Sequence, residues 1–289
     1  MMDTIPRYLF NAKELDEESG MYYYEARYHD PKSGTFISRD VYFEKQPFMS
    51  PYAYCNNNPI NLVDPDGRQA QPTTVRIMFY GGSRKDDNTF LNAANNVSKS
   101  YGGTTQKVQI QNAQTIIKYL NKQKANSVKS LDIFSHSGNK QLYFKRGLAT
   151  NDLYLDSKAD HGWFGNSGSL DNINMNVFTN DARVEIHGCN AASIEGNDNY
   201  NFASAFSKKL YEAGKTDAVT IGHVTAGNPD NHTELGGDDY RHGGRRVYHN
   251  GEVLFFTRKE GHISNKTIQK YLDLKKEQGD SYDGSTQRY

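Results

Sequence analysis

The sequence predicts an α/β protein in which a mostly parallel sheet is flanked by helices, with a small segment of β-hairpins before it. After residue 73, apolar strand-like runs alternate with stretches of helical periodicity. The first 67 residues instead hold short aromatic runs separated by turn residues, and eight of the 20 tyrosines. The neutral total charge also divides: up to Gly67, six Lys and Arg face eleven Asp and Glu, so the segment carries −5 and the remainder +5. We therefore expect two domains, 1–67 and 68–289.

The N-terminal segment predicts short hairpins, because runs such as MYYYEARYHD and TFISRD are β-prone and aromatic. Turns are expected at Ser19-Gly20, Asp30-Pro31 and Ser33-Gly34. A stretch rich in Asn, Pro, Asp and Gly follows, and Asp66-Gly67 is its sharpest turn signal. Cys55 lies among aromatic residues and is expected to be a small buried hydrophobe.

The second segment predicts strands and helices in alternation. Strands are expected at 74–82, 107–111, 130–138, 141–147, 182–190 and 218–227. Helices are expected to begin near residues 88, 112 and 199, and a last one to cover 264–277. Residues 148–180 look irregular, Asn250-Gly251 signals a hairpin turn, and the tail 279–289 is expected to be disordered.

Composition excludes several classes of protein. Two cysteines cannot form a disulfide framework, a four-cysteine zinc site or an iron–sulfur cluster. A mean hydropathy of −0.83, without a long apolar run, predicts no membrane-spanning helix. The N-terminus lacks the pattern of a signal peptide. The balance of 34 basic and 34 acidic residues gives no overall attraction to nucleic acid or membrane.

The N-terminal segment resembles the RHS repeat-associated core across roughly residues 8–67. The matching residues, in the family's order, are Phe10-Asn11, Lys13-Glu14-Leu15, Ser19-Gly20, Tyr22-Tyr23-Tyr24, Ala26-Arg27-Tyr28, Asp30-Pro31, Gly34, Phe36, Tyr52-Ala53-Tyr54, Asn57-Asn58-Pro59 and Asp64-Pro65-Asp66-Gly67. The resemblance implies a β-cocoon core followed by a variable C-terminal toxin, as in bacterial polymorphic toxins. Some members cut themselves near the final DPxG motif, whereas we expect Asp64 and Asp66 here to form turns.

Two reactive side chains follow predicted strands of the second segment. In parallel sheets the functional site lies at the carboxyl ends of the strands. His136 closes the third expected strand and Cys189 closes the strand at 182–190, 53 residues later. Consecutive strands often pair, and a histidine beside a cysteine can take the thiol proton. The order and spacing therefore predict a His136/Cys189 catalytic dyad.

Here the second segment resembles the caspase-like, or clan CD, cysteine peptidases, over roughly residues 74–225. The motifs that carry the resemblance are Phe134-Ser135-His136-Ser137-Gly138 and Ile186-His187-Gly188-Cys189-Asn190-Ala191. The chain departs from the family where Ser137 intervenes between the histidine and Gly138, and the caspase signature around the cysteine is absent. The resemblance implies that Cys189 attacks a peptide carbonyl, that His136 assists proton transfer, and that no cofactor is needed.

Backbone groups near the two residues would bind the oxyanion in this family. The resemblance places the oxyanion site at the backbone N–H of Cys189, which Gly188 precedes, and at an N–H just after His136, in Ser137 or Gly138. His187 is the rival base, and we expect it to point to the opposite face of its strand and to be structural.

A second constellation leaves a different enzyme class open. The region 223–249 holds His223, His232, His242, His249, Asp238 and Asp239. These residue types can bind a metal, and Arg241, Arg245, Arg246 and Lys259 could neutralise phosphates, although no HExxH-like spacing is present. The alternatives are thus a metal-dependent nuclease toxin and a non-catalytic binding remnant.

Our main hypothesis is the C-terminal effector of an RHS-type polymorphic toxin that acts as a cysteine endopeptidase. It implies a protein substrate and a cognate immunity protein, with neither a metal nor another cofactor. It also implies secretion or delivery into target cells. We expect neither nucleic acid nor a membrane as a partner.

Overall fold

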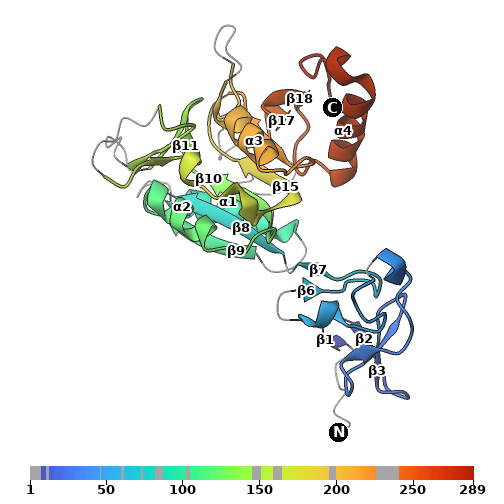
Figure 1. Cartoon of the computed structure of the whole chain (residues 1–289). Coiled ribbons are helices and arrows are strands. Elements are labelled where there is room, and N and C mark those ends of the chain that lie inside the picture. Colours follow the sequence, from blue (N-terminus) through green and yellow to red (C-terminus); the bar gives the residue numbers. More distant parts are fainter. Residues whose placement is uncertain are drawn as a thin grey trace. The chain divides into compact units, whose positions relative to one another are not determined.

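The computed structural model describes residues 8–10, 13–45, 47–59, 62–72, 74–81, 87–101, 105–144, 151–158, 165–194, 200–225 and 241–289. It divides into two compact units, Met1–Thr73 and Thr74–Tyr289 (Figure 1). We call them unit 1 and unit 2 and describe each by itself.

Unit 1 is built from short antiparallel strands. Its five-stranded sheet runs in the order β1 (Tyr8–Phe10), β2 (Lys13–Asp16), β3 (Met21–Tyr23), β4 (Tyr28–Asp30) and β5 (Thr35–Phe36), and β6 (Leu62–Val63) pairs separately with β7 (Gln71–Pro72). The core is aromatic: the rings of Tyr24, His29, Phe36 and Tyr54 lie 4.4–5.8 Å apart. Cys55 is 1% exposed beside them, and its burial raises the pKa of the thiol. Such a cysteine packs as a hydrophobe.

Unit 2 contains a seven-stranded mixed sheet in the order β18-β17-β16-β15-β10-β8-β9. Its strands are β8 (Val75–Gly81), β9 (Thr105–Ile110), β10 (Val128–Phe134), β15 (Phe178–Ile186), β16 (Val219–His223), β17 (Arg245–His249) and β18 (Glu252–Thr257). Strands β9, β8, β10, β15 and β16 are parallel, whereas β17 and β18 add an antiparallel hairpin. The α/β prediction is confirmed at this level.

In the part of unit 2 that the structure describes, four α-helices cover the two faces of this sheet. They are α1 (Asp87–Lys99), α2 (Ala113–Asn121), α3 (Phe202–Glu212) and α4 (Asn265–Gln278). Alternate residues of β10 separate the faces: Leu131 and Ile133 pack with α2 and α3, whereas Phe134 packs with α1. Helix α4 packs on Val219 and Ile221 of β16, on the same face as α1. Polar side chains of β10 and β15 occupy this second face between α1 and α4.

Local sequence signals explain the element boundaries. The Asn112 side chain accepts a hydrogen bond from the Thr115 N–H at 3.1 Å and so caps α2, as predicted. Asn201 and Ser264 cap α3 and α4 in the same way. Asn250 and Gly251 both have positive φ, 52° and 78°, as a tight hairpin turn between β17 and β18 requires.

The expected strand 130–138 is in fact two strands. β10 ends at Phe134, the chain bends at Ser135, and β11 (His136–Ser137) begins a second sheet. That sheet continues through β12 (Gln141–Tyr143), β13 (Leu153–Tyr154) and β14 (Gly168–Ser169). Strand β15 begins at Phe178, four residues before the expected start.

The C-terminal tail is ordered, and the expectation of disorder for 279–289 was wrong. The Phe256 N–H donates to the Gln287 carbonyl at 3.1 Å, and the Tyr289 N–H donates to the Phe256 carbonyl at 3.0 Å. Strand β18 is the edge of the sheet and offers unpaired backbone groups, which the tail satisfies. Tyr282 and Tyr289 also pack against the cluster under α4. None of the described helices is long and apolar enough to span a bilayer.

Candidate functional site

The two predicted catalytic residues follow neighbouring parallel strands. Ile133 of β10 pairs with Ile186 of β15, near the carboxyl ends of both strands. His136 lies two residues beyond the end of β10, and Cys189 lies three residues beyond the end of β15. Both are therefore at the edge of the sheet where parallel α/β folds place their reactive groups. His136 is exposed, and Cys189 is half-buried.

The segments that carry these residues are in direct contact. The Ser137 hydroxyl donates to the Cys189 carbonyl at 2.6 Å. A Cβ placed on Gly188 would lie 2.2 Å from the Ser137 Oγ and 2.7 Å from the Ser135 carbonyl oxygen. Only a glycine permits so close an approach of the two backbones. The structure therefore places Ser137 and Gly188, the chain neighbours of His136 and Cys189, against each other.

A stack of two aromatic rings also joins these two segments, two residues before His136 and Cys189. The rings of Phe134 and His187 are parallel, at an angle of 3°, with centroids 4.2 Å apart. Phe134 precedes His136 by two residues, and His187 precedes Cys189 by two. Phe90 of α1 makes an edge contact with the imidazole of His136, and the two ring centroids are 5.3 Å apart. The stack restricts how far the two segments can separate, and the edge contact packs the imidazole of His136 against α1.

The backbone groups expected at the oxyanion site have different roles. The Gly138 N–H donates to the Gln141 carbonyl at 2.9 Å and is committed to the β11–β12 hairpin. Gly188 provides the close backbone approach described above. From the sequence, only the backbone N–H of Ser137 was considered. In the structure its side-chain hydroxyl forms a hydrogen bond between the two segments.

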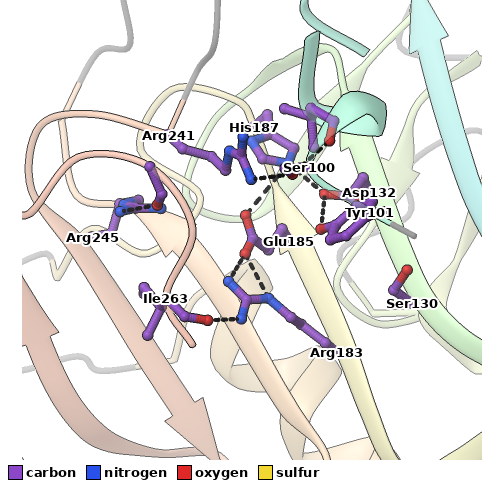
Figure 2. A network of polar contacts seen from close by, with 12 residues as sticks. Ser100, Tyr101, Ser130, Asp132, Arg183, Glu185, His187, Arg241, Arg245 and Ile263 are labelled. Carbon is purple, nitrogen blue, oxygen red and sulfur yellow. Dashed lines mark hydrogen bonds and ion pairs between the residues drawn. The ribbon is translucent and has the colours of Figure 1, made fainter. Parts of the chain in front are cut away.

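His187 belongs to a buried network on the face of the sheet between α1 and α4 (Figure 2). Its Nε2 lies 2.8 Å from Asp132 Oδ1 and 3.6 Å from Glu185 Oε2. The Tyr101 hydroxyl donates to Asp132 at 3.3 Å. The Arg183 guanidinium binds Glu185 and the Ile263 carbonyl. Every ring or charged group in this network except Tyr101 is less than 7% exposed. Its members pair with one another, and His187 is buried among them.

Burial and the surrounding charges set the protonation of the network. Burial raises the pKa of Asp132, and the hydrogen bond from His187 opposes this rise. Burial alone would raise the pKa of Glu185, but the positive charges of Arg183, His187, Arg245 and Arg241 lower it below its ordinary value. Glu185 therefore stays ionised. His223 lies nearby, and burial lowers its pKa to about 3, so it stays neutral.

Sequence reasoning missed Asp132, Arg183 and Glu185. A signal for two of them was present: Arg183, Glu185 and His187 occur at every second residue of a strand that was expected to be buried. Polar residues with that period must share one face, and buried polar groups need partners.

Asp132, Glu185 and His187 also place three potential ligand atoms within 4.8 Å of one another. These donors already have partners, since Arg183 binds Glu185 and His187 bonds Asp132. Three arginines act on two carboxylates in this region, namely Arg183, Arg241 and Arg245 on Asp132 and Glu185. A metal cation would have to displace Arg183 from Glu185, in a region where positive charges already outnumber negative ones. The residues therefore suit an ion-pair network better than a metal centre.

The histidines of 223–249 do not form one cluster among the residues that the structure describes. His223 and His242 are buried, with ring centroids 6.2 Å apart. His249 lies at the other end of β17 from Arg245, the pairing partner of His223, about 14 Å away at the usual rise of a strand. There its Nε2 is 2.7 Å from the Thr216 carbonyl. His249 is therefore too far from His223 to share one metal ion with it, and His232, Asp238 and Asp239 lie outside the described residues.

The four cations that were expected to neutralise phosphates differ in their exposure to solvent. Arg241 and Arg245 are 4% and 1% exposed, and they donate inward to Ser100 Oγ and to the carbonyls of Lys259 and Gly261. Arg246 is half-buried and lines a surface cavity. Buried arginines cannot meet a nucleic-acid backbone, so two of the four expected cations are unsuited to that role.

Comparisons with known proteins reach only parts of the chain. It is 39% identical over 72 residues to salivary gland surface protein 1 of Aedes aegypti, covering 25% of this chain and 2% of that protein. It is 44% identical over 64 residues to tRNA nuclease WapA of Bacillus subtilis, covering 21% and 3%. It is 34% identical over 107 residues to the putative uncharacterized protein YlbH of Escherichia coli, covering 34% and 42%. No protein-family profile and no solved structure matches.

Proposed function

We propose that unit 2 is a cysteine peptidase in which Cys189 is the nucleophile and His136 the general base. The contact that supports it most is the hydrogen bond from Ser137 to the Cys189 carbonyl, which joins the residue after His136 to Cys189 itself. Touching segments at the carboxyl ends of parallel strands, one with an accessible histidine and one with an accessible cysteine, suit nucleophilic catalysis.

The proposed reaction follows from the two side chains. The imidazole of His136 takes the proton of the Cys189 thiol, and the sulfur forms a bond to the carbonyl carbon of the substrate. The amine leaves with the proton from His136, and water then hydrolyses the thioester. The Cys189 N–H is the backbone donor we assign to the developing oxyanion, because the Gly138 N–H is already bonded to Gln141.

We further propose that the whole chain is part of an RHS-type polymorphic toxin, with unit 2 as its effector. The RHS resemblance of residues 8–67 supports this, as do three curated relatives whose names describe them as tRNA nucleases. The proposal implies delivery into a target cell and a cognate immunity protein that neutralises the effector.

A nuclease effector is the second candidate, favoured by the names of those relatives. Their matches of 64 residues are far shorter than unit 2, which has 216 residues. A match of that length cannot cover the whole effector, so it does not carry the nuclease activity in those names over to unit 2. The expected metal site of this alternative also loses His249.

Expression of the full chain in a bacterial host separates the two candidates. We expect the wild type to arrest growth and to create new protein N-termini, and Cys189→Ala and His136→Ala to do neither. Cys55→Ala is the matched control, because that buried cysteine lies in unit 1. Growth arrest by Cys189→Ala with intact proteins and fragmented tRNA would instead support the nuclease and refute the peptidase.

A further inference from the structure

An arginine-lined cavity of about 620 Å³ lies on unit 2 beside the turn that follows Cys189. Arg246 of β17, Arg258 just after β18 and Arg288 of the tail all line it, together with Phe256 and Ile194. Its volume is within the range of small-ligand pockets, about 300–1,000 Å³. The ordered tail is necessary for the cavity, because it supplies Arg288.

The cavity carries a concentrated positive charge. No Asp or Glu side chain is among its lining residues, and no ion pair joins Arg246, Arg258 or Arg288 to a carboxylate in the part of the chain that the structure describes. The guanidinium groups of Arg258 and Arg288 lie 5.8 and 5.3 Å from the centre of the Phe256 ring. A shared aromatic contact orients both cations. Arg288 also donates to the Gln287 carbonyl at 2.9 Å, and hydrogen bonds from Ser285 together with the Arg288 charge lower the pKa of the nearby Asp283. Arg246 and Arg258 therefore carry most of the charge that an anionic ligand would meet.

Arg246 connects this cavity to the proposed nucleophile. It donates to the Ala192 carbonyl at 2.8 Å, and Ala192 follows Cys189 by three residues. Three Cα–Cα steps span at most about 11 Å. The Ala192 Cα, whose carbonyl group Arg246 binds, is therefore within about 11 Å of the Cys189 Cα. A substrate that reaches Cys189 could therefore place a neighbouring part of its chain in the cavity.

We propose that this cavity binds acidic side chains of the protein substrate, to one side of the scissile bond. The inference rests on the proposed peptidase function. Arginine recognises a carboxylate through two parallel hydrogen bonds, so three converging arginines suit a segment with more than one Asp or Glu. Single-stranded nucleic acid is instead bound along extended grooves that track several phosphates, whereas these charges meet in one cavity.

Binding of a short acidic peptide tests the proposal without any catalysis. The protein is the full chain with Cys189→Ala, and the probes are fluorescein-labelled hexaglutamate and hexaglutamine peptides, followed by fluorescence anisotropy at low and high salt. We expect hexaglutamate to bind, salt to weaken the binding and hexaglutamine not to bind. The double variant Arg258→Glu/Arg288→Glu should bind hexaglutamate at least about tenfold more weakly.

Two further variants make the result specific. Arg258→Gln/Arg288→Gln removes the charges without reversing them, and it should also weaken binding. Lys118→Glu reverses a single charge on α2, which packs at the opposite edge of the sheet, and it should bind like the parent. Equal affinity of the parent and both arginine variants for hexaglutamate would overturn the proposal.

An RNA oligonucleotide of similar charge is the competing probe. If it binds the cavity more tightly than hexaglutamate and loses affinity in both arginine variants, the acidic-peptide assignment is wrong. Because the Cys189→Ala background has no nucleophile, failure of this binding experiment leaves the peptidase proposal standing. Failure of the growth and N-terminus experiment, in turn, leaves the measured binding intact.

Discussion

Gly188 offers a direct perturbation of the contact between the dyad segments. In Gly188→Ala, the new Cβ would lie 2.2 Å from the Ser137 Oγ and 2.7 Å from the Ser135 carbonyl oxygen. The serine side chain can rotate, but the backbone oxygen must move by about 0.7 Å to reach an ordinary contact of about 3.4 Å. Overpacking of this kind costs about 1–3 kcal/mol. For a 216-residue unit, that lowers Tm by about 2–12 °C.

The same displacement should separate His136 from Cys189. A misplacement of about 1 Å can cost about a hundredfold in rate, so we expect Gly188→Ala to slow alkylation of Cys189 by iodoacetamide much more than its loss of stability explains. The assay is mass spectrometry of the modified peptide, at a temperature where the variant is folded.

Gly168→Ala is the control for overpacking alone. Its Cβ would lie 2.5 Å from Ile117 Cδ1, in β14 at the far edge of the smaller sheet. It should lower Tm without changing the alkylation rate. Wild-type Tm and wild-type reactivity in Gly188→Ala would refute the close contact that we describe.

Two further predictions concern the buried network. Arg183→Ala leaves the Glu185 carboxylate, at 2% exposure, without the arginine that binds it directly, and should lower the free energy of unfolding by about 3–5 kcal/mol. In denaturant titrations Arg183→Met/Glu185→Leu should recover most of that loss, and failure of any such recovery would contradict the assignment of an ion pair. Burial lowers the pKa of His223 from 6.5 to about 3, so the unfolded chain takes up a proton below pH 6.5 that the folded chain does not. The contribution of neutral His223 to the free energy of unfolding is therefore complete above pH 6.5. It falls by about 1.4 kcal/mol per pH unit as the pH falls toward 3, which amounts to about 2 kcal/mol at pH 5. His223→Gln should show a correspondingly shallower fall in Tm between pH 7 and 5; parallel curves for the two proteins would be evidence against it.

The sequence predicted the strand–helix order of unit 2 because each element has a local signal. Asn112 and Asn250-Gly251 lie where capping and turn chemistry place them. The tail could not be predicted, since its order depends on the unpaired edge of β18, which only the assembled sheet reveals.

In the candidate site, too, the sequence identified some residues and missed the contacts that depend on the assembled fold. His136 and Cys189 were identifiable because they follow apolar strands. The role of the Ser137 hydroxyl depends on the bend at Ser135 and on contact between residues 52 positions apart, which no local pattern encodes. The arginine cavity combines β17, β18 and a tail that was expected to be disordered, so sequence reasoning had no basis for it.

The central claim is that His136 activates Cys189, and the pH dependence of thiol alkylation tests it most directly. The measurement is the second-order rate constant for iodoacetamide at Cys189, between pH 5 and 10, in the wild type and in His136→Ala. We expect Cys189 to be alkylated faster in the wild type than in His136→Ala at neutral pH, because the imidazole takes the thiol proton. Superimposable profiles for the two proteins would contradict it.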